Sequence, residues 1–219
     1  MLLKTSGLVI REKVLSNDNR MLTILTGEYG IIKAFIRTSR KMRSSLAAAI
    51  DLFSYSDFLI FFNKDQYCVD GAETNRIFYH LREDLEKTSL AAYMGELAET
   101  LVPQGEPAQE YLSLMLNCLH LLETDQRTVD FIKPLFELRL LTMAGYMPDL
   151  VGCTCCGQYQ AEQFYFSHYT GKLLCANCCE QEKPQGYVPL TKDQLAAMRH
   201  IVNADPKKIF SFTLGDAGR

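Results

Sequence analysis

Residues 1–80 carry short apolar segments separated by polar residues and turn signals, a spacing typical of β-strands. Gly27–Gly30 is a turn signal between the second and third segments, and Asn63–Asp65 predicts a hairpin between the last two. Five short strands joined mainly by hairpins are typical of a small barrel of the oligonucleotide-binding (OB) type. An SH3-like barrel is the alternative that the pattern leaves open. The predicted strands cover residues 7–14, 20–26, 31–36, 53–62 and 66–69.

Beyond the predicted strands the apolar period changes to that of amphipathic helices. The third of these helices is expected to be buried around most of its circumference, with Pro134 at its start or in its first turn, where the missing N–H does no harm. Thr191 and Gln194 form a capping box that begins a fourth helix. The apolar faces comprise Leu90, Met94, Leu97, Ala98 and Leu101, then Leu112, Met115, Leu116, Leu119 and Leu122, then Phe136, Leu138, Leu140, Leu141 and Met143, then Leu195, Met198, Ile201 and Val202.

Together these segments predict an α+β protein of several domains. An N-terminal OB-fold β-barrel is followed by an α-helical domain into which a four-cysteine module is inserted. The expected boundaries are 1–80 for the barrel, 81–148 for the first part of the helical domain, 149–186 for the module and 187–219 for the returning helical segment.

The chain contains two Cys-x-x-Cys pairs, and the stretch between them has a length typical of four-thiolate zinc sites. Cysteines at this spacing can direct both thiolates at one ion, and two such pairs complete a tetrahedron. Four thiolates leave no open coordination position, so we expect one structural Zn²⁺. A disulfide or redox pair is the alternative, and Cys155 or Cys179 could replace a neighbouring ligand. The expected ligands are Cys153, Cys156, Cys175 and Cys178.

Charge is distributed unevenly along the chain. Residues 1–80 carry 11 Lys or Arg and 8 Asp or Glu, whereas residues 81–219 carry 12 and 18. Basic residues gather in and before the connection from Thr38 to Asp51, beside hydroxyl side chains that also bind phosphates. A solvated surface loop is the alternative, and the sequence does not single out an aromatic residue for base stacking. The expected DNA-binding residues are Lys33, Arg37, Arg40, Lys41 and Arg43.

Motifs of several enzyme classes are absent from the sequence. It has no Gly-x4-Gly-Lys-Ser/Thr, no Gly-x-Gly-x-x-Gly and no His-Glu-x-x-His, and its four histidines are scattered. We therefore expect a protein that is not an enzyme. Residues 1–13 carry four charges and no long apolar run, so neither a signal peptide nor a membrane span is expected. Clustered cysteines then indicate metal binding in a reducing cytoplasm.

Several short segments, in their order and spacing, resemble the RecO family of bacterial recombination mediators. The resemblance covers most of residues 1–202, although the family usually continues through further C-terminal helix, so we expect a truncated or unusually short member. The matching segments are Lys4–Arg11, Asn19–Thr26 with Tyr29-Gly30, Ala91–Leu97, Phe136–Leu141 with Gly145-Tyr146 and Pro148, Cys153–Gly157, Phe166-Ser167 and Gly171–Cys178.

The resemblance implies a cytoplasmic, nucleoid-associated DNA repair protein that binds single- and double-stranded DNA and anneals complementary strands. It further implies loading of the RecA recombinase onto strands coated by single-strand binding protein, with RecR as a second partner. The acidic tail of single-strand binding protein is expected to dock beside the third helix, through Arg127, Lys133 and Arg139. The competing hypotheses are a zinc-ribbon interaction adaptor without DNA affinity and a thiol oxidoreductase that uses the Cys-x-x-Cys pairs.

Overall fold

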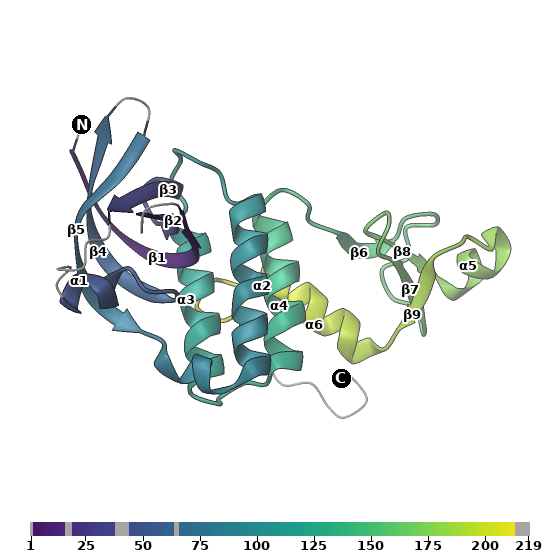
Figure 1. Ribbon diagram of the computed structural model, residues 1–219. Coiled ribbons are helices and arrows are strands. Elements are labelled where there is room, and N and C mark those ends of the chain that lie inside the picture. The colour runs from purple at the N-terminus through teal and green to yellow at the C-terminus, as the bar shows by residue number, and fades with distance from the viewer. Residues whose placement is uncertain (1, 16–18, 38–43, 64–65, 213–219) are drawn as a thin grey trace. The chain divides into compact units, whose positions relative to one another are not determined.

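The computed structural model describes residues 2–15, 19–37, 44–63 and 66–212 of a mixed α+β protein (Figure 1). The chain forms two compact units, residues 1–136 and 137–219. None of the helices in the described ranges has both the length and the apolar composition needed to cross a membrane. The strands are β1 (Leu2–Val14), β2 (Asn19–Thr26), β3 (Gly30–Arg37), β4 (Ser54–Asn63), β5 (Gln66–Ile77), β6 (Asp149–Cys153), β7 (Phe164–Ser167), β8 (Lys172–Cys175) and β9 (Tyr187–Leu190). The helices are α1 (Ser44–Ala49), α2 (Leu85–Leu101), α3 (Gln109–Glu123), α4 (Val129–Met143), α5 (Ala176–Glu182) and α6 (Lys192–Asn203), with a 3₁₀ helix at Tyr79–Glu83.

Strands β1 to β5 close into a barrel in the order β1-β2-β3-β5-β4. β1 is long enough to pair with two strands. Its first part pairs with β4 and its later part with β2, both antiparallel. A short parallel contact between β3 and β5, in which Ala34 faces Tyr67 and Phe35 faces Cys68, completes the circle. The predicted β-rich N-terminal segment is thus confirmed.

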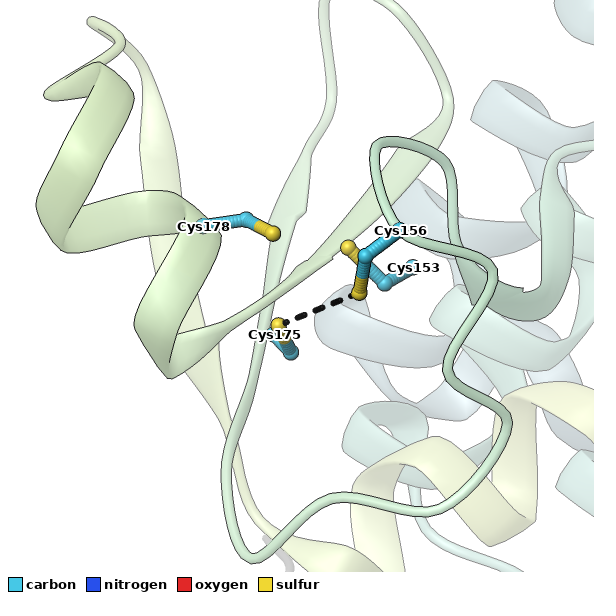
Figure 2. A group of neighbouring side chains, drawn as sticks. All are labelled: Cys153, Cys156, Cys175 and Cys178. Atoms are coloured by element: carbon cyan, nitrogen blue, oxygen red, sulfur yellow. Dashed lines mark hydrogen bonds between the residues drawn. The ribbon is translucent and has the colours of Figure 1, made fainter.

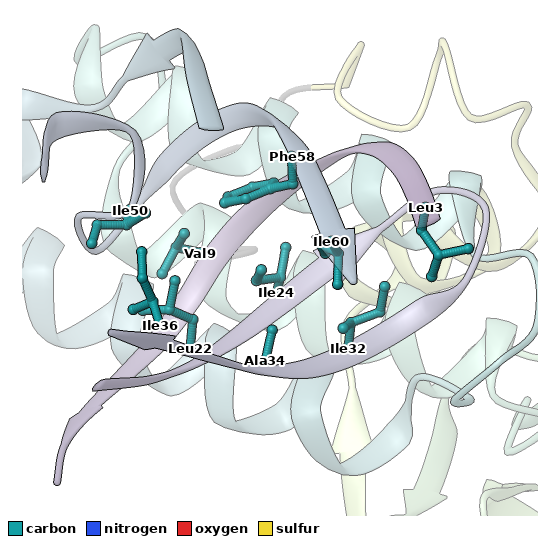
Figure 3. Close-up of a cluster of buried hydrophobic side chains, with 10 residues drawn as sticks. All are labelled: Leu3, Val9, Leu22, Ile24, Ile32, Ala34, Ile36, Ile50, Phe58 and Ile60. Atoms are coloured by element: carbon teal, nitrogen blue, oxygen red, sulfur yellow. The ribbon is translucent and has the colours of Figure 1, made fainter. Parts of the chain in front are cut away.

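Alternating side chains fill the barrel interior (Figure 3). Ile32, Ala34 and Ile36 of β3 belong to the buried core, so the intervening Lys33 and Phe35 lie on the outer surface. This alternation is the signal that made the strands recognisable in the sequence. The buried core cluster comprises Leu3, Val9, Leu22, Ile24, Ile32, Ala34, Ile36, Ile50, Phe58 and Ile60.

The predicted end of the fifth strand was wrong. β5 continues to Ile77, well beyond the expected end at Val69. The added part contains Gly71 and the exposed Asp70 and Glu73, so it lacks an apolar alternation. It is a strand because it pairs with β4 along its length, which satisfies its backbone groups whatever its side chains are.

The β2–β3 hairpin docks on the connection between α2 and α3, within the first unit. The backbone N–H of Ile31 donates to the Pro103 carbonyl at 3.2 Å, and that of Gly105 donates to Tyr29 at 2.9 Å. Gly30 has a φ of +61°, and a β-carbon there would overlap the Pro103 carbonyl oxygen. Only glycine satisfies both the left-handed backbone and this close approach.

The three central helices follow the predicted apolar faces, with one correction. α4 begins at Val129, so Pro134 lies inside the helix and not in its first turn. At this position Pro134 cannot donate to the carbonyl of Asp130. Both residues are exposed, so solvent can hydrate that carbonyl. Leu141, one of the apolar residues of the predicted face, is 39% exposed, so that part of the helix surface is open to solvent.

The second unit contains a four-stranded sheet in the order β6-β8-β7-β9. β7 and β8 pair antiparallel as a hairpin, and Leu195 and Val202 of α6 share a buried core with Leu173 of β8. The predicted capping box of Thr191 and Gln194 begins α6 and is confirmed.

Candidate metal centre and nucleic-acid surface

Four cysteine sulfurs converge in the second unit (Figure 2). Their Sγ atoms all lie within 4.8 Å of one another, and those of Cys156 and Cys175 are 3.8 Å apart. Zinc–thiolate bonds of about 2.3 Å in a tetrahedron place sulfurs about 3.8 Å apart, so the cluster has the dimensions of a four-thiolate metal site. The four residues are the predicted set: Cys153, Cys156, Cys175 and Cys178.

Secondary structure brings the two cysteine pairs together. Cys153 ends β6, and a turn follows in which the Gly157 N–H donates to the Cys153 carbonyl at 2.8 Å. Gly157 has a φ of +74°, which glycine adopts at little cost. Cys175 ends β8 and is the N-cap of α5, so Cys178 lies in the first turn of that helix. Pairing of Cys153 with Leu173 joins the two halves.

The local electrostatics favour a thiolate at Cys153. Burial acts to raise the pKa of Cys153, but backbone N–H groups of Cys156, Cys175 and Cys155 donate to its sulfur and lower the pKa to about 6. The pKa of Cys178 is raised, mainly by its hydrogen bond with the Cys175 thiol. A cation bound between the four sulfurs would favour the thiolate form of the cysteines that hold it.

The two neighbouring cysteines have other surroundings. The Cys155 sulfur donates to a Glu182 carboxylate oxygen at 3.2 Å, and the carboxylate raises the pKa of Cys155. Cys179 packs against the buried core of the second unit, and burial raises its pKa. All eight cysteines are free thiols, including Cys118, whose pKa burial also raises.

Of the predicted DNA-binding residues, Lys33 is the one whose side chain can be placed. Its Nζ lies 2.8 Å from a carboxylate oxygen of Glu99 on α2, and Arg11 of β1 contacts the same carboxylate at 3.1 Å. The hydrogen bond from Lys33, followed by that from Arg11, lowers the pKa of Glu99. The charge of Lys33 is thus balanced within the protein. Sequence reasoning missed Glu99, because it is one of many helix carboxylates and only the fold places it beside β1 and β3.

The other predicted cations follow Lys33 in the sequence. Arg37 is the last residue of β3, with its backbone opposite Asn19 of β2. Arg40, Lys41 and Arg43 lie outside the described residues.

The residues predicted to bind a partner's acidic tail occupy different environments. In the first unit, the Arg127 guanidinium lies 4.6 Å from the Phe131 ring centroid, and the Lys133 ammonium lies 5.9 Å from that of Tyr93. In the second unit, Arg139 is buried and donates to the carbonyls of Ile201 and Val202 at 3.1 and 3.0 Å. Arg139 thus binds the last turn of α6.

Comparison with known proteins gives a consistent result along the whole chain. Residues 1–78 match the family described as "Recombination protein O N terminal", and residues 82–219 match "Recombination protein O C terminal". The "DNA repair protein RecO" of Acetivibrio thermocellus is 34% identical over 215 residues, which cover 98% of this chain and 85% of that protein. The "DNA repair protein RecO" of Alkaliphilus metalliredigens is 36% identical over 178 residues, which cover 81% of this chain and 72% of that protein. This chain belongs to the RecO family.

RecO-family membership confirms the resemblance drawn from the sequence motifs. The two RecO matches meet between residues 78 and 82, at the 3₁₀ helix that follows the barrel. The two compact units divide later, within α4, so α2 and α3 belong to the same unit as the barrel.

Proposed function

We propose that this RecO-family protein is a DNA repair and recombination mediator. It binds single- and double-stranded DNA, anneals complementary strands and helps to load recombinase onto strands coated by single-strand binding protein. Family membership across both halves of the chain carries the proposal. The barrel supports it, because its five strands and their order suit an OB fold, an architecture that binds oligonucleotides.

The proposed mechanism is charge neutralisation and not covalent chemistry. Phosphate repulsion opposes the approach of two strands, and Lys and Arg side chains remove it by displacing counterions. Arg37, Arg40, Lys41 and Arg43 would provide these contacts between β3 and α1. Lys33 would have to exchange Glu99 for a phosphate, so its contribution is expected to be smaller. Once repulsion is removed, base pairing proceeds downhill without catalysis.

We further propose that Cys153, Cys156, Cys175 and Cys178 hold one structural Zn²⁺. The sulfur separations support this assignment, as do the surroundings of Cys155, which faces Glu182. When bound, the ion would fix the β6 turn to the start of α5. Four thiolates would leave it no position for substrate.

The proposed partners follow from the family. RecR and single-strand binding protein would act with this protein at DNA in the cytoplasm, close to the nucleoid. Arg127 and Lys133 of the first unit offer cations above aromatic rings, which suits an acidic tail with apolar residues. Arg139 supports α6 and is a weaker candidate for this contact.

Two assays with the full-length protein test the proposal. A fluorescently labelled single strand is titrated to measure binding, and two complementary labelled strands are mixed to follow annealing by energy transfer. We expect saturable binding and annealing that is faster than the protein-free rate. Absence of both would favour an interaction adaptor without DNA affinity.

A further inference from the structure

The outer surface of the barrel carries an apolar row that crosses all five strands. Its members are cross-strand neighbours, because Leu2 pairs with Phe61, Phe61 with Cys68, Cys68 with Phe35 and Phe35 with Met21. Side chains at such paired positions lie on the same face of a sheet, about 4.5–5.5 Å apart. The outer apolar row is defined as Leu2, Met21, Phe35, Phe61 and Cys68.

The burial of their chain neighbours shows that these side chains face away from the core. Leu3 and Ile60, which adjoin Leu2 and Phe61, point into the barrel and are 4% and 0% exposed (Figure 3). Leu2 and Phe61 themselves are 48% and 45% exposed. Large apolar side chains that adjoin one another at a surface indicate a binding site, because their hydration is unfavourable. The row is thus a candidate surface that the fold does not use for its own core.

Part of the row forms a wall of a pocket of about 570 Å³. This volume lies within the range of small-ligand sites, about 300–1,000 Å³. Phe35 and Cys68 contribute apolar surface, and Asn19, Gln66 and Asp70 contribute amide and carboxylate groups. At the edge of a nucleobase the amides can donate or accept hydrogen bonds, and the carboxylate can accept them. A pocket with an aromatic ring, an apolar wall and polar groups at its rim suits a flat heterocycle such as a nucleobase.

The cations around the row suit a polyanion. The exposed Lys13 lies opposite Met21, and the exposed Lys4 follows Leu2 by two residues on the same face. Ile36 and Leu46, which both line the pocket, precede and follow the basic segment Arg37–Arg43 in the sequence.

We propose that the outer apolar row is the base-stacking platform of this protein, with Phe61 and Phe35 stacking unpaired bases of single-stranded DNA. The inference rests on the proposed DNA binding and assigns it a surface. Bases would lie on the row while phosphates face the flanking cations, the arrangement of sequence-tolerant single-strand binders. The two rings are separated by β5, so each would take a different base.

The absence of tryptophan from the chain allows a direct test. The variant Phe61→Trp places a single indole on the row, at a position exposed enough to accept it. The full-length variant is titrated with a labelled dT oligomer of about 15 nucleotides, and anisotropy and indole emission are recorded together. We expect indole quenching that saturates with binding. An oligomer of abasic sugar-phosphates should bind more weakly and leave the emission unchanged.

Matched variants separate stacking from other effects. Phe61→Leu keeps an apolar side chain but removes the ring, and it should weaken dT binding about 5-fold or more, since one base stack is worth about 5- to 150-fold. The salt dependence should stay unchanged, because phosphate contacts are untouched. Tyr79→Trp, at an exposed aromatic residue outside the barrel strands, is the control and should show no quenching.

The outcomes distinguish the two proposals. Binding by anisotropy with unchanged Phe61→Trp emission and unchanged Phe61→Leu affinity would overturn the stacking platform and leave DNA binding intact. If the unsubstituted protein binds no oligomer, both the proposed DNA binding and the stacking platform are wrong. Emission that changes with protein concentration in the absence of DNA would identify the row as a contact between copies of this chain and would also overturn the proposal.

Discussion

At the scale of single residues, six cysteines between Cys153 and Cys179 show how closely spaced thiols differ. Four direct their sulfurs at one point, one faces a carboxylate and one packs into a core. The two-residue spacing identified the converging set, because each pair closes a turn whose first and last side chains project to the same side.

Replacement of Cys175 by Ser is predicted to remove the metal. Serine is a good N-cap, so the start of α5 should be preserved while one ligand is lost. Structural zinc is worth about 10–16 kcal/mol of coupled binding and folding, so the second unit should become sensitive to protease while the barrel persists. Elemental analysis should give one zinc per unsubstituted chain and almost none for the variant.

The neighbouring thiols provide the controls. Cys155→Ser and Cys179→Ser should each retain one zinc per chain, since their sulfurs lie outside the converging group. Loss of zinc from either control, with retention in Cys175→Ser, would move the site to the alternative cysteines.

At the scale of elements, the docking of the β2–β3 hairpin depends on Gly30. Gly30→Ala should destabilise the protein by two effects, a left-handed backbone and overlap with the Pro103 carbonyl. Gly105→Ala is the matched control, because φ is +77° there but no atom lies within 4 Å of the added carbon. We expect a cost of about 1–2 kcal/mol for Gly105→Ala and about 1–3 kcal/mol more for Gly30→Ala. Urea unfolding measures both, and equal costs would show that the contact is not tight.

The segment between β3 and α1 is predicted to set the salt dependence of DNA binding. If three phosphates are neutralised, log affinity should fall with log salt with a slope near −2, at roughly 0.7 per phosphate for single strands. Combined replacement of Arg40, Lys41 and Arg43 by Ala should flatten this slope and weaken binding to all sequences alike. Lys207→Ala with Lys208→Ala, two exposed cations of the second unit, is the control. An unchanged slope in the triple variant would place the phosphate contacts elsewhere.

At the scale of the whole molecule, charge is distributed unevenly along the chain. The N-terminal part, up to His80, carries a small positive excess, and the remainder is acidic. The net negative charge of residues 81–219 disfavours DNA binding by this part of the chain. We therefore expect it to contact proteins, at places where a few cations lie close together.

An acidic tail peptide of single-strand binding protein is predicted to bind the full-length chain through Arg127 and Lys133. Their combined replacement by Ala should weaken binding about 2- to 30-fold, since each exposed charge pair is worth about 0.2–1 kcal/mol. Anisotropy of a labelled peptide measures the change, again with Lys207→Ala and Lys208→Ala as the control. Arg139→Ala is unsuitable, because it would break the hydrogen bonds to α6. Unchanged affinity would show that the tail does not bind through Arg127 and Lys133.

The sequence by itself indicated the barrel strands, the helices α2, α3, α4 and α6, and the cysteine set, because each depends on local spacing. Alternation marks a half-buried strand, a period of 3.6 marks a helix face, and two residues between cysteines close a turn. The wrong predictions, the end of β5 and the place of Pro134, arose where the structure does not follow from local spacing. The second half of β5 is ordered by pairing with β4, and the place of Pro134 within α4 depends on where the first turn begins.

Only the tertiary structure decided which groups from distant segments meet. Glu99 balances Lys33 and Arg11, and Arg139 binds the end of α6, although neither pairing has a local signal. The outer apolar row likewise exists only through strand register, which places Phe35 and Phe61 on one face although they are distant in the sequence. Local spacing fixes which side of an element a residue faces, whereas the partner it meets there depends on how the elements pack.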